Sequence, residues 1–189
     1  MQNLKERIIK DGYVIGDDIL KVDSFINHQV DTKLLDELGE YFSHKFEGVT
    51  KILTIETSGI AFGVGVASHF GYVPLVFAKK SKSKILDERN LYTTVVDSFT
   101  KGTTNTVSVD KRFLNKGDRC LIVDDFMAAG NAALGLIDLC EQAGAEVVGV
   151  AIVIEKGFQG GRKRVEAKGI RVESAAIVDC FLDGKPVLR

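Results

Sequence analysis

Residues 121–132 read LIVDDFMAAGNA, and this stretch decides the architecture expected of the whole chain. An apolar run that ends at Val123 is typical of a buried strand, and two carboxylates, Asp124 and Asp125, follow it directly. Open α/β sheets hold ligands beyond the carboxyl ends of their parallel strands. The stretch therefore predicts a ligand site at a strand end, where the acidic pair meets hydroxyl groups of the ligand.

The residues after the acidic pair have little side-chain bulk and lead into a helical pattern. They are Ala128, Ala129, Gly130, Asn131 and Ala132. The backbone of such a loop can close around a phosphate with its amides pointing inward, and a helix N-terminus behind it adds partial positive charge. An acidic pair after a strand can equally be solvated, or hold a metal in another kind of α/β protein. On these residues alone, both interpretations stay open.

Hydrophobic periodicity extends an alternating pattern of helices and strands in both directions from this stretch. Helices are expected over 4–10, 30–46, 61–70, 131–142 and 159–168, and strands over 51–56, 73–78, 119–123, 147–154 and 172–178. Gly144 is expected to end the helix behind the motif. Two β-rich runs, 95–100 and 104–109, flank a Lys-Gly turn and predict a hairpin. The pattern predicts one α/β domain over residues 1–189, with a mostly parallel sheet.

Composition narrows the class of protein. With 25 Lys and Arg against 26 Asp and Glu, the chain lacks the basic balance that nonspecific nucleic-acid binding favours. Its apolar runs are too short to cross a bilayer and its first ten residues are charged, which predicts a cytoplasmic protein with no membrane partner. Cys120, Cys140 and Cys180 lie far apart in apolar surroundings, so we expect reduced, buried thiols.

Two other strand ends carry residues suited to anions. Thr57, Ser58 and Gly59 form a polar turn before a helix, which is either an ordinary cap or a second place where an anion meets backbone amides. A run of lysines begins at Lys79 and Lys80. Such a run is usually a solvated surface, but beside the expected ligand site it can neutralise an anion.

A further strand end and a long excursion are also candidates for ligand contact. Lys156 and Phe158 follow the strand over 147–154. A phenylalanine there is either core or a face that stacks on a planar ring, while a lysine can meet polar atoms at the ring's edge. Residues 84–114 include the expected hairpin and many residues with no core pattern. An excursion of this length is either disordered or functional, for example as a lid.

The 121–132 stretch resembles the phosphoribosyl diphosphate binding motif of the type I phosphoribosyltransferases. That motif is an apolar strand, two acidic residues, three variable residues, Thr-Gly, one variable residue, and Thr or Ser. Ala129 and Ala132 stand where the motif has hydroxyls, so backbone amides, and Asn131 with them, would have to hold the phosphate. In lacking these hydroxyls and in carrying IEKGFQ over 154–159, the chain resembles the xanthine-using members of the family.

The resemblance implies a fold and a reaction. The fold would be the type I phosphoribosyltransferase fold, with helices flanking the sheet, a flexible hairpin lid that includes Ser98 and Phe99, and a hood formed by about residues 1–30 plus C-terminal elements. The reaction would be transfer of the 5-phosphoribosyl group from phosphoribosyl diphosphate to xanthine in purine salvage, giving xanthosine monophosphate and pyrophosphate. Mg²⁺ would bind mainly through oxygens of the donor, and the enzyme would be a homodimer.

The resemblance also assigns roles to residues. Asp124 and Asp125 would hold the ribose hydroxyls and 128–132 the 5-phosphate. Contacts to the donor's pyrophosphate would come from Thr57, Ser58, Gly59, Lys79 and Lys80, and contacts to xanthine from Leu20, Asn27, Lys156 and Phe158. Guanine, hypoxanthine or adenine as the base stays an alternative. So does a purine regulator that senses phosphoribosyl diphosphate, although such regulators carry a separate DNA-binding domain for which the segment before the first core strand is too short.

Overall fold

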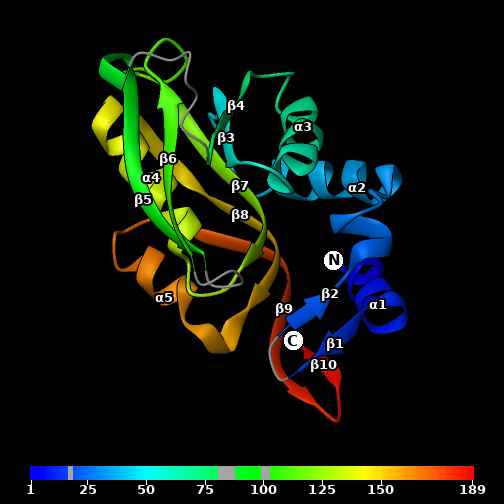
Figure 1. Cartoon of the computed structure of the whole chain (residues 1–189). Helices are drawn as coiled ribbons and strands as arrows, with labels where there is room; N and C mark the ends of the chain where they lie inside the picture. The colour runs from blue at the N-terminus through cyan, green and yellow to red at the C-terminus, as the bar shows by residue number, and fades with distance from the viewer. Residues whose placement is uncertain (17–18, 81–87, 99–102) are drawn as a thin grey trace.

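The computed structural model describes residues 1–16, 19–80, 88–98 and 103–189. Its α-helices are α1 (Gln2–Asp11), α2 (Thr32–Ser43), α3 (Gly59–His69), α4 (Asn131–Ala143) and α5 (Gly161–Glu166). Its strands are β1 (Tyr13–Ile15), β2 (Ile19–Lys21), β3 (Lys51–Ile55), β4 (Leu75–Ala78), β5 (Leu91–Ser98), β6 (Thr103–Asp110), β7 (Arg119–Met127), β8 (Glu146–Lys156), β9 (Val172–Leu182) and β10 (Lys185–Leu188). Figure 1 shows their arrangement.

A six-stranded sheet runs through the molecule in the order β10-β9-β8-β7-β3-β4. Neighbouring strands from β9 to β4 are parallel, and β10 alone in this sheet runs antiparallel, against β9. The mostly parallel sheet predicted from the sequence is confirmed. The hairpin that adds β10 was not predicted, because KPVL is too short and too mixed in polarity to carry a strand pattern.

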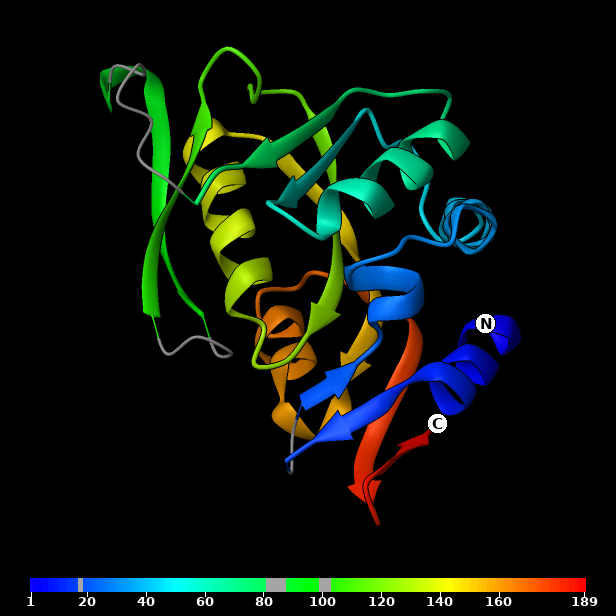
Figure 2. The same ribbon diagram turned by 45° about the vertical axis from the view of Figure 1, so that its right-hand side comes forward.

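Both faces of the sheet are covered, which explains why the apolar runs of β7 and β8 are continuous. Along β7, Leu121 and Val123 join one core with α2 and α3, whereas Cys120 and Ile122 join the other core with α4 and the hairpin β5–β6. The alternation follows from the two-residue period of a strand. Figure 2 shows the hairpin lying outside α4, away from the sheet.

Small residues let α2 and α3 approach closely. A Cβ on Gly39 would lie 2.5 Å from the carbonyl oxygen of Gly65, and a Cβ on Gly65 would lie 2.1 Å from Leu35 Cδ2. Gly144 ends α4 in the left-handed region with φ 69°, as predicted. The helix predicted over Ala61–Phe70 is therefore confirmed as α3. Its glycines are explained by the close packing of this helix.

The N-terminal segment folds beside the C-terminal strand. Helix α1 and strand β1 contact β10, and the segment continues through β2 into a π-helical turn (Asp23–Asn27) that reaches β7 through Asn27 (Figure 2). The helix α1 was predicted, with Leu4 and Ile8 buried. Ile9 is exposed because it lies on the outer face of the helix.

Strands β7 and β8 continue past their predicted ends, and this difference relocates the acidic pair. β7 pairs with β8 as far as Met127↔Glu155, although its pairing with β3 ends at Leu53↔Ile122. Asp124 and Asp125 therefore lie within β7, beyond its contact with β3, and not in a loop after it. Lys156 likewise lies in β8, whose strand hydrogen bonding continues past the last residue of its apolar run.

The predicted hairpin is present as β5 and β6, which pair antiparallel from Leu91↔Asp110 to Ser98↔Thr103. Phe99 and the rest of its turn, and the lysines at 82 and 84, lie outside the described residues. In the part of the chain that the structure describes, no helix is long and apolar enough to cross a membrane.

The three cysteines are free, as predicted, but they differ in burial. Cys120 and Cys140 are buried, and a hydrogen bond between the two thiols together with burial raises the pKa of Cys140. Cys180 is exposed near the end of β9, which corrects the prediction that all three are buried.

Candidate active site

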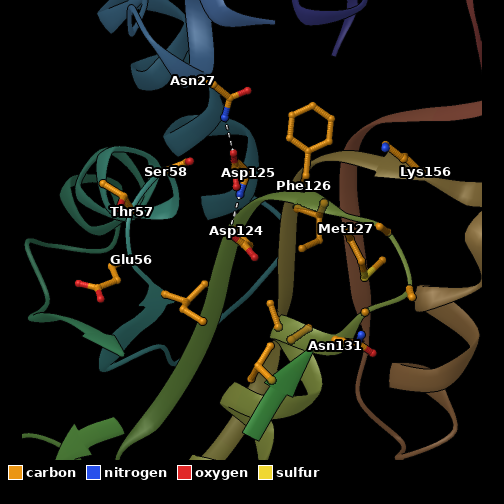
Figure 3. Close-up of a pocket in the computed structure, with 18 of the residues that line it drawn as sticks. Asn27, Glu56, Thr57, Ser58, Asp124, Asp125, Phe126, Met127, Asn131 and Lys156 are labelled. Carbon is orange, nitrogen blue, oxygen red and sulfur yellow. Dashed lines mark hydrogen bonds between the residues drawn. The ribbon is translucent and has the colours of Figure 1, made fainter. Parts of the chain in front are cut away.

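A cavity of about 390 Å³ opens at the carboxyl ends of β3, β7 and β8. Several separate parts of the chain meet around it, and Figure 3 shows many of the lining residues. The lining comprises Ile19, Leu20, Lys21, Asp23, Asn27, Ile55, Glu56, Thr57, Ser58, Lys80, Val96, Asp97, Asn105, Asp124, Asp125, Phe126, Met127, Ala128, Ala129, Gly130, Asn131, Ala132, Ala133, Ile152 and Lys156. A cavity therefore lies at the strand ends, where the sequence predicts a ligand site.

The acidic pair forms one wall of the cavity and bonds to the hood. Asp125 accepts a hydrogen bond at Oδ2 from Asn27 Nδ2 over 2.6 Å, and its own backbone N–H donates to Asp124 Oδ1 over 3.0 Å. Asp124 is 6% exposed. Burial first, and then the adjacent charge of Asp125, hold the pKa of Asp124 well above the ordinary carboxyl value. Asp124 is therefore buried, whereas Asp125 is only partly buried.

Gly59 lies behind the acidic pair, outside the cavity lining. A Cβ there would fall 2.2 Å from Thr54 Oγ1 and 3.0 Å from Asp124 Oδ1. Only a residue without a Cβ lets the start of α3 approach this closely. Thr54 Oγ1 is fully buried, with no hydrogen-bond partner among the described residues. Sequence reasoning did not select Thr54, because a threonine inside a strand carries no signal that separates it from ordinary core.

The turn after β3 lines a second side of the cavity. Thr57 and Ser58 face the cavity, and the Glu56–Thr57 peptide bond is cis. Glu56 Oε1 accepts a hydrogen bond from the backbone N–H of Lys80 over 2.5 Å, which fixes the two strand ends together. Lys80 is part of the lining, whereas Lys79 makes backbone hydrogen bonds with Ser108 in both directions and lies outside it.

All the residues of the 128–132 loop line the cavity. Gly130 has φ 82°, a conformation that favours glycine, and a Cβ there would lie 3.0 Å from Gly161 Cα. The side chain of Asn131 donates to Asp97 O over 3.2 Å and accepts from Arg164 over 2.7 Å. These bonds tie its amide group to the protein, so a phosphate contact from that side chain stays a prediction.

On the hood side, Leu20, Asn27 and Lys156 line the cavity as the sequence suggested. Leu20 is 5% exposed and Lys156 is 6% exposed. Phe158 lies elsewhere: it is 45% exposed and packs edge-on against Phe181, with ring centroids 5.6 Å apart.

Phe126 supplies the aromatic ring of the described lining. Sequence reasoning selected Phe158 because it follows a strand, and passed over Phe126 although it lies inside the motif. Phe126 could not be selected because the sequence pattern did not show how far β7 extends. Once the strand is known to reach Met127, Phe126 lies on it next to the acidic pair.

The chemistry of the cavity suits a ligand with phosphates and hydroxyls, together with a divalent cation. Among the described residues there is no group of three or more His, Cys, Asp or Glu side chains able to hold a metal by themselves. Two adjacent carboxylates are nevertheless oxygen ligands of the kind that Mg²⁺ takes when substrate phosphates and water complete its shell. The residues present therefore fit a Mg²⁺ ion that arrives with a phosphorylated ligand.

Comparison with known proteins places this geometry in a family. The model of the phosphoribosyl transferase domain matches residues 29–183. Over its full length the chain is similar to the xanthine phosphoribosyltransferase of Clostridium novyi, with 53% identity covering 100% of both chains. It is also similar to xanthine phosphoribosyltransferase 1 of Clostridium perfringens, with 57% identity covering 98% of both.

Solved structures support the fold. The adenine phosphoribosyltransferase of Rhodothermus marinus is 26% identical, with a TM-score of 0.75 over 94% of this chain and 100% of that one. The adenine enzyme of Giardia lamblia, complexed with 9-deazaadenine, is 24% identical, with a TM-score of 0.76 over 92% of this chain and 96% of that one. The predicted type I phosphoribosyltransferase fold is confirmed.

Proposed function

The chain belongs to the phosphoribosyl transferase family, and from that membership we propose that it transfers the 5-phosphoribosyl group of phosphoribosyl diphosphate to a ring nitrogen of xanthine. The products are xanthosine monophosphate and pyrophosphate, as purine salvage requires. The observation that carries the proposal is that one cavity joins the hood, the acidic pair, the 128–132 loop and the turn after β3.

The donor is proposed to lie across the floor of the cavity. The 128–132 loop receives its 5-phosphate, Asp124 and Asp125 hold the ribose hydroxyls, and Thr57 and Ser58 meet the pyrophosphate. Lys80 lines the cavity beside that turn, so its ammonium group can neutralise the leaving anion. Gly59 and Lys79 support this side from outside the lining, through packing and through backbone bonding to β6.

In the transfer, the bond between the anomeric carbon and a pyrophosphate oxygen breaks as the bond to the ring nitrogen forms. Positive charge builds on the ribose, as in glycoside cleavage. The carboxylates lie where they can stabilise that charge, and the enclosed cavity holds the two reactants together. Mg²⁺ would be held mainly through the donor's oxygens, with the acidic pair beside it, and would supply additional positive charge.

The base is proposed to bind under the hood, between Leu20, Asn27, Phe126 and Lys156. An ammonium group is a hydrogen-bond donor only, so Lys156 can meet an oxo group of a purine but not the exocyclic amino group of adenine. This chemistry favours an oxopurine over adenine. Guanine and hypoxanthine stay alternatives for the base. Full-length similarity to enzymes named as transferases favours catalysis over a sensing role.

A pyrophosphate-release assay tests the proposal. Xanthine, guanine, hypoxanthine and adenine are supplied in turn at equal donor and Mg²⁺ concentrations. We expect the highest kcat/KM with xanthine. A higher value with another purine would assign a different base, whereas donor binding without release for any purine would indicate a sensor.

A cytoplasmic location is also proposed, supported by the free cysteines.

A further inference from the structure

Two consecutive carbonyl groups of the 128–132 loop, those of Ala128 and Ala129, point towards α5. Ala128 O accepts a hydrogen bond from the backbone N–H of Gly161 over 3.2 Å, and Ala129 O accepts one from Arg164 Nη1 over 2.5 Å. Gly161 allows this contact, because a Cβ there would lie 2.4 Å from Ala128 O. The loop therefore rests on α5 through two consecutive carbonyls.

The direction of these carbonyls fixes the direction of the amides that follow them. In a trans peptide the C=O of one residue and the N–H of the next point in opposite directions. Holding Ala129 O against Arg164 turns the N–H of Gly130 away from α5, and holding Ala128 O against Gly161 does the same for the N–H of Ala129. Both residues belong to the cavity lining, whereas no residue of α5 does.

Arg164 also connects the loop to the hairpin. The same Nη1 atom donates to Asn131 Oδ1 over 2.7 Å, and Asn131 Nδ2 donates to the carbonyl of Asp97 on β5. The other arginine of α5 has different partners: Arg162 binds the buried carboxylate of Glu155 through two nitrogens. Arg164 is thus the side chain of α5 that joins α5, the loop and β5.

We infer that Arg164 is a positioning residue for the 5-phosphate, which holds the loop so that backbone amides can replace the hydroxyl contacts missing at Ala129 and Ala132. This inference rests on the proposed function, in which the loop receives the 5-phosphate. The guanidinium acts by holding the Ala129 carbonyl outward, and its charge adds to the positive potential of the loop.

Ribose 5-phosphate and pyrophosphate, each used as an inhibitor competing with phosphoribosyl diphosphate, separate the two halves of the donor site. In Arg164→Ala we expect the inhibition constant of ribose 5-phosphate to rise about tenfold, which corresponds to about 1.4 kcal/mol. The inhibition constant of pyrophosphate should change less than about twofold, because the turn after β3 does not depend on α5. Arg164→Lys should recover part of the loss, since lysine can donate one bond to the carbonyl.

Lys163→Ala is the matched control, since it removes an exposed charge of the same sign from the same helix. Arg164→Met, which keeps the apolar length of the side chain, gives the same comparison if the alanine variant does not fold. Equal ribose 5-phosphate inhibition in the Arg164 and Lys163 variants would overturn the inference, as would an equal weakening of both inhibitors. A wild-type protein that releases no pyrophosphate with any purine would instead refute the proposed function.

Discussion

Asn27 Nδ2 donates a hydrogen bond to Asp125 Oδ2 over 2.6 Å, although the two residues are 98 positions apart in the chain. This bond joins the hood to the strand that carries the acidic pair (Figure 3). An amide nitrogen has two hydrogens, so Asn27 can keep this bond and still donate to a second acceptor. The proposed base site and the proposed ribose site therefore share a side chain.

The Asn27–Asp125 bond predicts that changes at Asn27 affect both substrates. Asn27→Ala should lower kcat/KM for xanthine about tenfold, since the proposed polar contact to the base is lost, and raise the donor KM by a smaller factor. Asn27→Asp should be worse for both, because it places a second carboxylate against Asp125. Steady-state kinetics with each substrate varied will check this. A donor KM that is unchanged in both variants would show that the bond does not couple the two sites.

The buried acid Asp124 predicts an opposition between activity and stability. Its raised pKa means that the folded protein keeps a proton which the unfolded chain has already lost. Wild-type stability therefore declines as pH rises from about 4, the ordinary carboxyl value, through the folded pKa. Asp124→Asn should be more stable than wild type above that pH range. Each kcal/mol gained in the free energy of unfolding should raise Tm by about 2–4 °C. The variant should also lose most of its turnover.

Thermal unfolding of the Asp124→Asn variant at pH 4, 6 and 8, beside the wild-type protein, measures this effect. The advantage of the variant should shrink towards zero at the lowest pH, where both chains are neutral at this position. A variant less stable than wild type at pH 8 would contradict the assignment of a destabilising buried charge.

Gly130 and Gly160 offer a matched test of the loop. Both have positive φ, 82° and 76°, so alanine costs roughly 1–2 kcal/mol of backbone strain at either position. A Cβ at Gly160 meets open space, whereas one at Gly130 lies 3.0 Å from Gly161 Cα. Gly130→Ala should therefore weaken donor binding in calorimetry, while Gly160→Ala should keep wild-type affinity. Equal donor affinity in the two folded variants would exclude a role for the loop backbone.

The two candidate aromatic residues can be separated by substitution. Phe126→Ala should lower kcat/KM for xanthine strongly, because Phe126 lines the cavity, while Phe158→Ala should have a small effect, because its ring packs on Phe181. Lys156→Ala should reduce the preference for xanthine over other purines. The purine oxygen that loses its partner would then be buried without a hydrogen bond, which weakens binding by about 1–3 kcal/mol. A larger loss from Phe158→Ala than from Phe126→Ala would return the stacking role to Phe158.

A homodimer is expected from the family resemblance. Exposed apolar side chains such as Tyr13 on β1 and Leu182 on β9 leave surface available for association. Light scattering at working enzyme concentration should give about twice the mass of one chain. A fully active monomer would contradict this prediction.

The sequence determined the local elements around the site. The apolar run before Asp124, the small residues up to Ala132 and the stop at Gly144 predict a strand, a loop and a helix, and all three are present. Such features are readable because strand periodicity, turn residues and helix ends are set by neighbouring positions. The alternation of helices and strands likewise indicated a mostly parallel sheet.

Only the tertiary structure decided what surrounds those elements. The pairing of β7 with β8, extended past its contact with β3, placed the acidic pair and Phe126 on a strand. Folding back of the hood brought Asn27 to Asp125, and packing of α5 brought Arg164 to Ala129. The strand partners Arg119 and Glu146 are 27 positions apart, and the other contacts join residues still farther apart. Their partners depend on how sheet register and layer packing bury apolar surface throughout the domain, which no short stretch of sequence specifies.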